Sequence, residues 1–83
     1  MHEIRFDEKA IRFLEKLPKA IRKRIYNKII STKENPYHFF EKLESRQDFK
    51  LRVGDYMVIA DISDKEIYVT LIGHRKNVYK NNR

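Results

Sequence analysis

A cluster of cationic, titratable and aromatic side chains stands near the carboxyl end of the chain. It comprises His74, Arg75, Lys76 and Tyr79, and it directly follows an apolar run. A histidine exchanges a proton near neutral pH, an arginine matches the geometry of phosphate oxygens, and a tyrosine ring can stack on a base. Titratable, cationic and aromatic side chains that gather where a strand ends are a common arrangement for a functional site.

A second pair of cations lies two residues apart in a segment with the alternation of a strand. Lys50 and Arg52 alternate with Phe49, Leu51 and Val53, so the two cations share the open face of the strand while the apolar residues face the core. They are suited to hold a phosphate; the alternative is a pair of solvated strand residues. We expect this open face and the carboxyl-terminal cluster to meet around one nucleotide-sized hollow.

The charge of the chain is segregated along the sequence. The 83 residues include 19 basic and 12 acidic side chains, a net charge of +7. Residues 19–33 carry six cations and residues 74–83 carry four, and neither segment contains an acid. This pattern favours a polyanionic partner, namely RNA, DNA or an acidic protein segment, and the simplest alternative is a basic surface that only aids solubility.

Several classes of site are absent from the sequence. There is no cysteine, and the only glycines are Gly54 and Gly73, so neither a thiolate site nor a glycine-rich phosphate loop is possible. No metal-ligand spacing occurs, and we expect His2 and His38 to be structural. We therefore expect no cofactor and no metal. No apolar run approaches the ~20 residues that cross a bilayer, which predicts a soluble, cytoplasmic protein without a membrane partner.

The first third of the chain predicts a strand followed by two helices. Residues 2–6 alternate weakly as a strand does, and Asp7 is suited to cap the helix that follows. Apolar residues then recur at helical spacing up to Leu17, and Pro18 suits the first position of a second helix. Asn35-Pro36 is expected to stop that helix. We expect the pair to form an antiparallel hairpin that covers a sheet.

The rest of the chain predicts a three-stranded antiparallel meander in a single domain spanning residues 1–83. The strands are expected at about 48–53, 56–62 and 66–73, and residues 80–83 are expected to fray. Residues 35–47 fit no element clearly. They are too apolar for a free loop, so we expect Leu43 and at least one phenylalanine to pack on the edge of the domain. The fold class predicted is α+β.

This series of features resembles the RelE/ParE superfamily of bacterial and archaeal toxins. The resemblance covers nearly the whole chain and rests on Phe13-x-x-x-Leu17, a basic second helix ending at Asn35-Pro36, Leu43, Leu51-Arg52-Val53-Gly54-Asp55-Tyr56, and the closing His74-Arg75-x-x-Val78-Tyr79. It implies a helical hairpin packed on one face of a small, mostly antiparallel sheet, with the site on the other face.

The resemblance also implies a function. The ending is closer to the RelE branch, whose members cleave messenger RNA on the ribosome, than to ParE relatives, which poison DNA gyrase. Expected partners are a cognate RelB-like antitoxin, the ribosome and mRNA, with operator DNA reached indirectly through the antitoxin. The alternatives are a ParE-like gyrase inhibitor and a binding module that acts only as a co-repressor with its antitoxin.

Roles for individual residues follow from the same resemblance. RNA is cut without metal when its 2′-hydroxyl attacks the neighbouring phosphorus, which requires a base, cations and an acid. The predicted catalytic residues are Lys50, Arg52, His74, Arg75 and Tyr79. The predicted RNA-binding residues are Lys19, Arg22, Lys23, Lys28, Arg46, Lys76 and Lys80.

Each catalytic prediction has a structural alternative. Arg75 would stabilise charge on the phosphate, or it would form a strand-end ion pair with a residue such as Asp61. His74 would be the general acid, or it would only hydrogen-bond at the strand end. Tyr79 would stack on a base, or it would pack back on the sheet.

The sequence departs from the RelE pattern at one position. Met57 follows Tyr56 where the best-studied relatives have an arginine that aids catalysis. A methionine has no charge to bind phosphate, so another cation such as Arg46, Arg52 or Arg75 must replace it.

Overall fold

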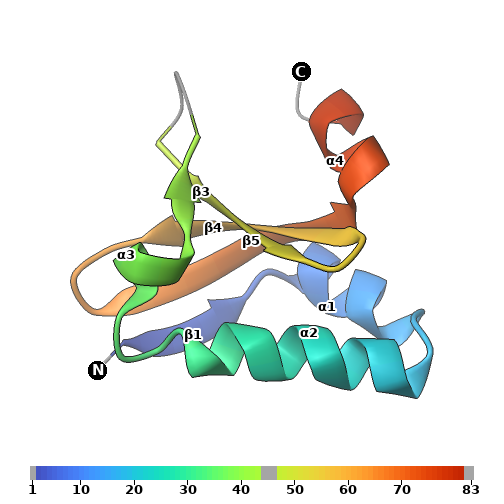
Figure 1. Cartoon of the computed structure of the whole chain (residues 1–83), viewed down its shortest axis with the longest axis horizontal. Coiled ribbons are helices and arrows are strands. Elements are labelled where there is room, and N and C mark those ends of the chain that lie inside the picture. Colours follow the sequence, from blue (N-terminus) through green and yellow to red (C-terminus); the bar gives the residue numbers. More distant parts are fainter. Residues whose placement is uncertain (1, 44–46, 82–83) are drawn as a thin grey trace.

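A five-stranded sheet with helices on both faces forms the protein (Figure 1). The computed structural model describes residues 2–43 and 47–81, with the side chains of the last helix described up to residue 78. In chain order the elements are β1 (Glu3–Phe6), α1 (Glu8–Glu15), α2 (Lys19–Ser31), α3 (Pro36–Phe39), β2 (Glu41–Lys42), β3 (Phe49–Val53), β4 (Tyr56–Ile62), β5 (Glu66–His74) and α4 (Arg75–Asn81). None of the helices in this described part is long and apolar enough to cross a membrane.

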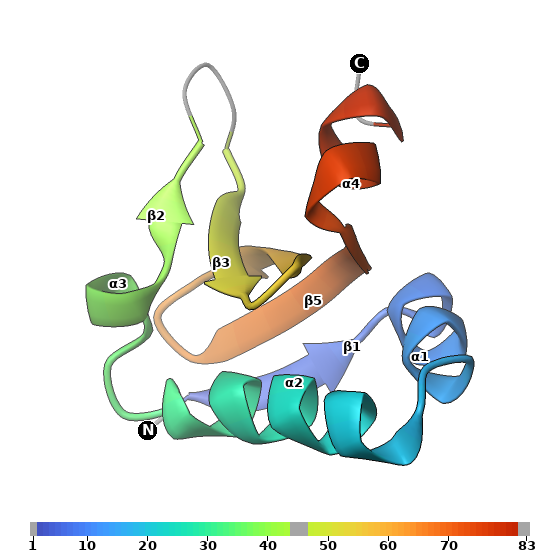
Figure 2. The same ribbon diagram turned by 45° about the vertical axis from the view of Figure 1, so that its right-hand side comes forward.

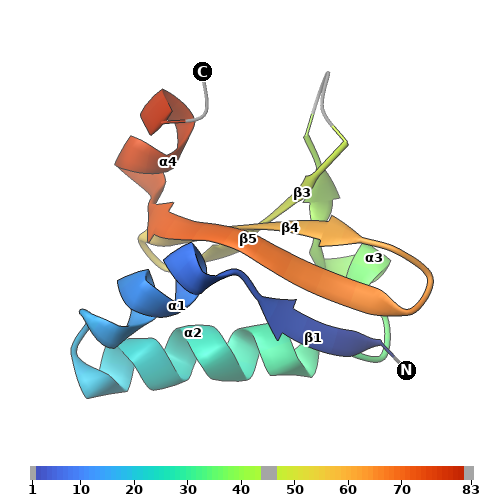
Figure 3. The same ribbon diagram turned by 180° about the vertical axis from the view of Figure 1, so that it is seen from behind.

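The sheet is mostly antiparallel, as predicted. Its strand order is β1-β5-β4-β3-β2, and only β1 pairs in parallel, with β5. The three predicted strands correspond to β3, β4 and β5 and form the expected meander. Helices α1 and α2 lie together on one side of the sheet, and α4 lies on the other (Figures 1 and 3).

Helix α1 begins where the sequence predicts. The Asp7 carboxylate accepts a hydrogen bond from the backbone N–H of Lys9 at 2.9 Å, which caps the helix. The Tyr68 hydroxyl donates to the same carboxylate at 3.0 Å and thereby ties the cap to β5. The hydrogen bonds from Lys9 and Tyr68 hold the pKa of Asp7 below its usual range. Ala10 and Leu14 are the buried members of the predicted stripe.

Helix α2 differs from the prediction at both ends. Pro18 precedes the helix as its N-cap instead of occupying the first helical position. The helix ends at Ser31, because the backbone N–H and hydroxyl of the buried Thr32 both turn back to the carbonyl oxygen of Ile29. Pro36 therefore opens the short helix α3 instead of stopping α2, since proline suits the first position of a helix.

The main core lies between the sheet and helices α1 and α2. Ile25 and Ile29 of α2 are fully buried against β-strand residues that include Val58, Ile67 and Val69. Alternate residues of β3 behave as predicted, because Leu51 and Val53 are buried and Arg52 is exposed. The cations of β3 are thus directed to the opposite face.

A second, smaller core lies on that opposite face. Met57, Ile59 and Val78 are buried in it, with Leu43 and Leu71 packed alongside. Val78 belongs to α4, a helix that the sequence did not predict: residues 74–79 were singled out for their side chains, and residues 80–83 were expected to fray. The helix depends on tertiary packing, because a single buried valine gives no readable periodicity. A Cβ at Gly73 would lie 2.8 Å from the Val78 side chain, so the hydrogen of glycine allows this close approach.

The segment that fitted no element contains α3 and the two-residue strand β2, which pairs with β3 (Figure 2). Phe40 is buried in the main core and Leu43 packs on the second core, which confirms the expectation for this segment. Tyr37 and Phe39 remain exposed.

Candidate phosphate-binding site

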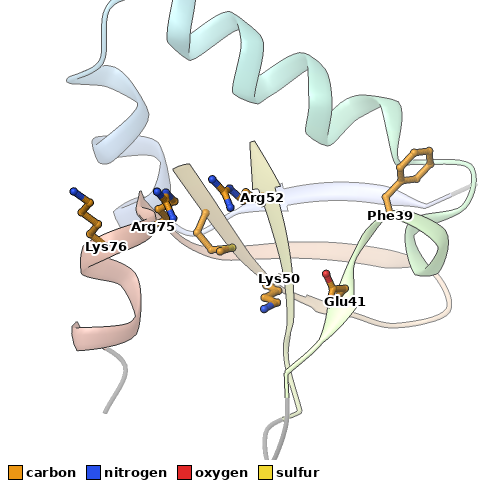
Figure 4. A pocket seen from close by; sticks show the side chains of 7 residues that line it. Phe39, Glu41, Lys50, Arg52, Arg75 and Lys76 are labelled. Atoms are coloured by element: carbon orange, nitrogen blue, oxygen red, sulfur yellow. The ribbon is translucent and has the colours of Figure 1, made fainter. Parts of the chain in front are cut away.

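Four cations line one hollow on the α4 side of the sheet. The hollow, here called the cation pocket, has a volume of about 410 Å³ and is lined by Phe39, Glu41, Lys50, Arg52, Met57, Arg75 and Lys76. Figure 4 shows that its charged residues come from β2, β3 and the start of α4. The structure therefore brings Lys50 and Arg52 together with Arg75 and Lys76, which are two of the four residues of the carboxyl-terminal cluster.

Strand β3 and the turn after it position Arg52. The Nε–H of Arg52 donates to the carbonyl oxygen of Gly54 at 2.9 Å, which fixes the guanidinium group beside the turn. Gly54 has a φ of 60°, a left-handed conformation that glycine adopts without strain. Arg52 is also paired across the sheet with Met57, so the methionine forms an apolar wall next to the cation.

The same turn holds Arg75. The backbone N–H of Arg75 donates to the carbonyl oxygen of Asp55 at 2.8 Å. The Arg75 Nε lies 3.9 Å from the Asp55 carboxylate, in an ion pair whose side chains are 42% and 72% exposed. The ion pair named as the structural alternative for Arg75 is thus present, with Asp55 as its partner instead of Asp61, which lies opposite Tyr68 in the register of β4 and β5. An exposed pair at this distance contributes little, so a bound phosphate can displace it.

Glu41 adds a carboxylate that the sequence analysis missed. Strand β2 pairs Glu41 directly with Lys50, so both side chains line the pocket. Among the pocket-lining residues that the structure describes, Glu41 is the only acid. The pairing depends on a two-residue strand too short to recognise in the sequence. A carboxylate is a group that can accept a proton.

His74 lies outside the cation pocket. Its ring lines a neighbouring hollow between α1 and α4, 5.7 Å from the Tyr56 ring. The backbone N–H of Lys76 donates to its Nδ1 at 3.3 Å. The structure thus separates His74 from the four cations and gives it the strand-end hydrogen bond named as its structural alternative.

Three predicted residues have no described side chain. Tyr79 and Lys80 lie on α4, which places their backbone on the helix that begins at the pocket. Arg46 falls outside the described residues.

The predicted RNA-binding cations of α2 lie on the helix that covers the other face of the sheet (Figure 3). Arg22 and Lys23 border an apolar hollow with Ile11 and Tyr26, and Lys19 is an exposed residue in the first turn. Lys28 is different, because it lines a groove together with Arg24 and Arg52.

Because Arg52 borders both this groove and the cation pocket, the two form a continuous cationic band around the sheet edge. Arg24 is a member that the sequence did not single out, and its guanidinium lies against Gly54.

Within residues 2–43 and 47–81, no group of three histidine, aspartate or glutamate side chains lies close enough together to hold a metal ion. The chemistry that the pocket offers is that of cations and one carboxylate.

Solved structures of RelE toxins share this fold. The chain is similar to a chain of the RelBE2 toxin–antitoxin complex from Mycobacterium tuberculosis, with a TM-score of 0.79 and 24% identity over 89% of this chain and 98% of that one. The chain is also similar to a mutant of E. coli toxin RelE in the free state, with a TM-score of 0.78 and 22% identity over 98% of this chain and 90% of that one. A chain of the archaeal RelE–RelB complex from Pyrococcus horikoshii OT3 matches with a TM-score of 0.75 and 25% identity over 89% of this chain and 94% of that one.

Comparison of sequences gives the family. No curated protein matches the chain. A sequence model of the family described as ParE toxin of type II toxin–antitoxin system, parDE, matches residues 4–79. Because this match spans almost the whole chain and the fold is that of RelE toxins, the chain belongs to the RelE/ParE superfamily of type II toxin–antitoxin toxins.

Proposed function

We propose that the protein is a toxin that cleaves messenger RNA on the ribosome without a metal ion. The observation that carries the proposal is the cation pocket, where Lys50, Arg52, Arg75 and Lys76 surround a space large enough for a nucleotide. RelE-like toxins are generally endoribonucleases, and the pocket supplies groups for that chemistry. The toxin would act in the cytoplasm, where ribosomes and mRNA are found.

The proposed reaction is a transfer within the RNA chain. The 2′-oxygen attacks the adjacent phosphorus, a new P–O2′ bond forms, and the P–O5′ bond breaks. The 2′-hydroxyl proton passes to a base and solvent water supplies the proton that the leaving 5′-oxygen takes up, so the products are a 2′,3′-cyclic phosphate and a 5′-hydroxyl. Charge grows on the phosphate oxygens in the transition state, where fixed cations stabilise it most.

The pocket residues fit these roles in pairs. Arg52 and Arg75 are held by the same turn and would bind the phosphate oxygens, replacing the family arginine whose position Met57 occupies. Glu41 and Lys50 face each other across β2 and β3, and either would take the proton from the 2′-hydroxyl. General-base catalysis of this kind contributes roughly 10²–10⁴-fold.

Primer extension on ribosomes programmed with a defined mRNA tests the proposal. The wild-type toxin is expected to cut, and the Arg52→Ala/Arg75→Ala variant to cut at least about a hundredfold more slowly, the usual loss when a transition-state donor is removed. Glu41→Gln is expected to slow cleavage, because a neutral amide cannot take the proton that a carboxylate accepts. Lys42→Ala is the matched control, because Lys42 neighbours Glu41 on β2 yet does not line the pocket. Equal rates in the arginine variant and the control would refute the proposed site.

Gyrase inhibition is a second candidate function, and the family match itself favours it, since the matching description is that of ParE toxins. The buried Met57 in the pocket also removes one cation expected of a nuclease. A supercoiling assay with purified gyrase separates the two. Inhibition of gyrase by a protein that leaves mRNA intact on the ribosome would support this candidate over RNA cleavage.

The proposed partner is an acidic RelB-like antitoxin. The solved RelE chains from M. tuberculosis and P. horikoshii are in complexes with antitoxins. In this chain the exposed Tyr37 and Phe39 lie beside the edge strand β2, which offers apolar contacts and backbone groups for an added segment. Operator DNA would be reached through the antitoxin. If induced expression of the toxin is harmless while the complex binds its operator, the co-repressor alternative holds instead.

A further inference from the structure

A second cationic hollow lies next to the cation pocket, between α1 and α4. It has a volume of about 330 Å³ and is bordered by Lys9, Arg12, Phe13, Lys16, His74 and Asn77, among others. No acidic residue is among the described residues that line it. We call it the α1–α4 hollow; none of its three cations belongs to the residues assigned above.

The cations of the hollow share one face of α1. Lys9, Arg12 and Lys16 are separated by three and four residues, which places them on neighbouring turns of the same side. Arg12 pairs with Glu8 one turn away, but the two side chains are 64% and 75% exposed. Such a pair contributes little, so a phosphate can compete for the guanidinium group.

Aromatic rings line the same hollow. Phe13 and His74 both border it, and each contacts the ring of Tyr56 edge-on, with centroids 6.2 and 5.7 Å apart. Asn77, one turn beyond His74, adds an amide that both donates and accepts hydrogen bonds. Cations combined with aromatic rings are the features by which proteins bind single-stranded nucleic acid.

The first turn of α4 joins the two hollows. His74 lines the α1–α4 hollow while the next two residues, Arg75 and Lys76, line the cation pocket. The hydrogen bond from the Lys76 backbone N–H to His74 Nδ1 holds His74, in the α1–α4 hollow, relative to Lys76, in the cation pocket. A single strand that crosses this turn would contact both hollows in succession.

We propose that the α1–α4 hollow is a second nucleotide subsite for the RNA that the cation pocket cleaves. Its cations bind the phosphate of a neighbouring nucleotide, and Phe13 and His74 contact the base. This inference rests on the proposed function and extends it, because it predicts that more than one nucleotide is bound by the toxin itself.

Binding of a short single-stranded RNA under a salt titration tests the subsite. The probe is a fluorescent heptanucleotide with 2′-O-methyl groups, which prevent attack by the 2′-oxygen, and affinity is measured by anisotropy. Each lost phosphate contact lowers the salt slope by about 0.7 for single strands. Lys9→Gln/Lys16→Gln removes the contact with one phosphate and is therefore expected to lower the slope by roughly 0.7 and the affinity at least about tenfold.

The matched control is Lys33→Gln/Lys65→Gln. It makes the same charge change at the other end of the sheet, where the backbone of His2 and of Glu3 bonds to Lys33 and Lys65. This variant is expected to keep the wild-type salt slope. With a mononucleotide, which fills the cation pocket alone, the Lys9→Gln/Lys16→Gln variant is expected to bind like the wild type.

The outcomes separate the subsite from the proposed function. Equal slopes in the two lysine variants, with Arg52→Ala/Arg75→Ala still abolishing mRNA cleavage, would overturn the subsite and leave the nuclease proposal standing. If the wild type neither binds the heptanucleotide nor cleaves mRNA, both proposals are wrong. A loss confined to Lys9→Gln/Lys16→Gln supports the subsite.

Discussion

At the scale of single residues, the site depends on side chains held by short polar contacts rather than on burial. Arg52 and Arg75 are each fixed through the backbone of the β3–β4 turn, and Asp7 is fixed by the start of α1 and by Tyr68. The sequence indicated Arg52 and Arg75 because their residue types suit phosphate. It gave no sign of Glu41, whose place in the pocket comes entirely from its pairing with Lys50.

Asp7 gives a prediction at this scale. Its pKa is lowered in the folded protein by the hydrogen bonds from Lys9 and Tyr68, so its charge stabilises the fold above the pKa of the unfolded chain. That contribution is lost as the pH falls below about 4 and the carboxylate becomes protonated. Asp7→Asn keeps a capping oxygen but does not titrate.

The urea midpoint of the wild type is therefore expected to fall more steeply between pH 6 and pH 3 than that of Asp7→Asn. The variant should already be less stable at pH 6, because it has lost the charged acceptor of the Tyr68 hydroxyl. Parallel pH profiles for the two proteins would show that the Asp7 charge has no such role.

At the scale of elements, sequence patterns located β1, the two long helices and the three strands of the meander, and missed α3, β2 and α4. Helices α1 and α2 and strands β3 to β5 each carry several apolar residues at regular spacing. By contrast α3, β2 and α4 are short, and their formation depends on tertiary contacts such as that of Val78 with Gly73. Four of the seven residues that line the cation pocket belong to these short elements. The shape of the pocket could therefore not be predicted from the sequence, although its cations could.

The docking of α4 can be tested through Val78. This side chain is 1% exposed and belongs to the small second core. Val78→Ala is expected to loosen α4, to raise amide hydrogen exchange in residues 76–81 several-fold, and to slow mRNA cleavage, because Arg75 and Lys76 lose a fixed position.

Val53→Ala is the comparison for this test, since Val53 is buried in the main core. It is expected to lower the free energy of unfolding by about 1–3 kcal/mol without a selective change in α4. If Val78→Ala leaves exchange in α4 as it was, the small core does not anchor the helix.

At the scale of the whole molecule, cations are spread over both faces, but only some of them converge. The band from Lys28 and Arg24 through Arg52 reaches the cation pocket, and α1 carries the cations of the α1–α4 hollow. The charge pattern in the sequence predicted a polyanionic partner. It could not distinguish Lys23, which borders an apolar hollow, from Arg24, which turns toward the sheet edge.

This distribution predicts stabilisation by a generic polyanion. With a net charge of +7, inorganic polyphosphate is expected to raise the thermal midpoint by several degrees, because it binds the folded arrangement of cations more tightly than the unfolded chain. The rise should disappear at about 0.5 M NaCl, where screening is strong.

The Arg52→Ala/Arg75→Ala variant is expected to show a smaller rise than Lys33→Gln/Lys65→Gln, although both lose two charges. An identical rise in the two variants would mean that net charge alone, and not the converging cations, determines the effect.

The β3–β4 turn has a consequence for how substrate choice could change. Its two residues, Gly54 and Asp55, supply the carbonyl oxygens that hold Arg52 and the backbone of Arg75. The distance between the two guanidinium groups therefore depends on the conformation of one hairpin loop. Lengthening that loop by a single residue would re-space both groups at once, so natural or engineered length variation there would alter which phosphate geometry is accepted without replacing any charged side chain.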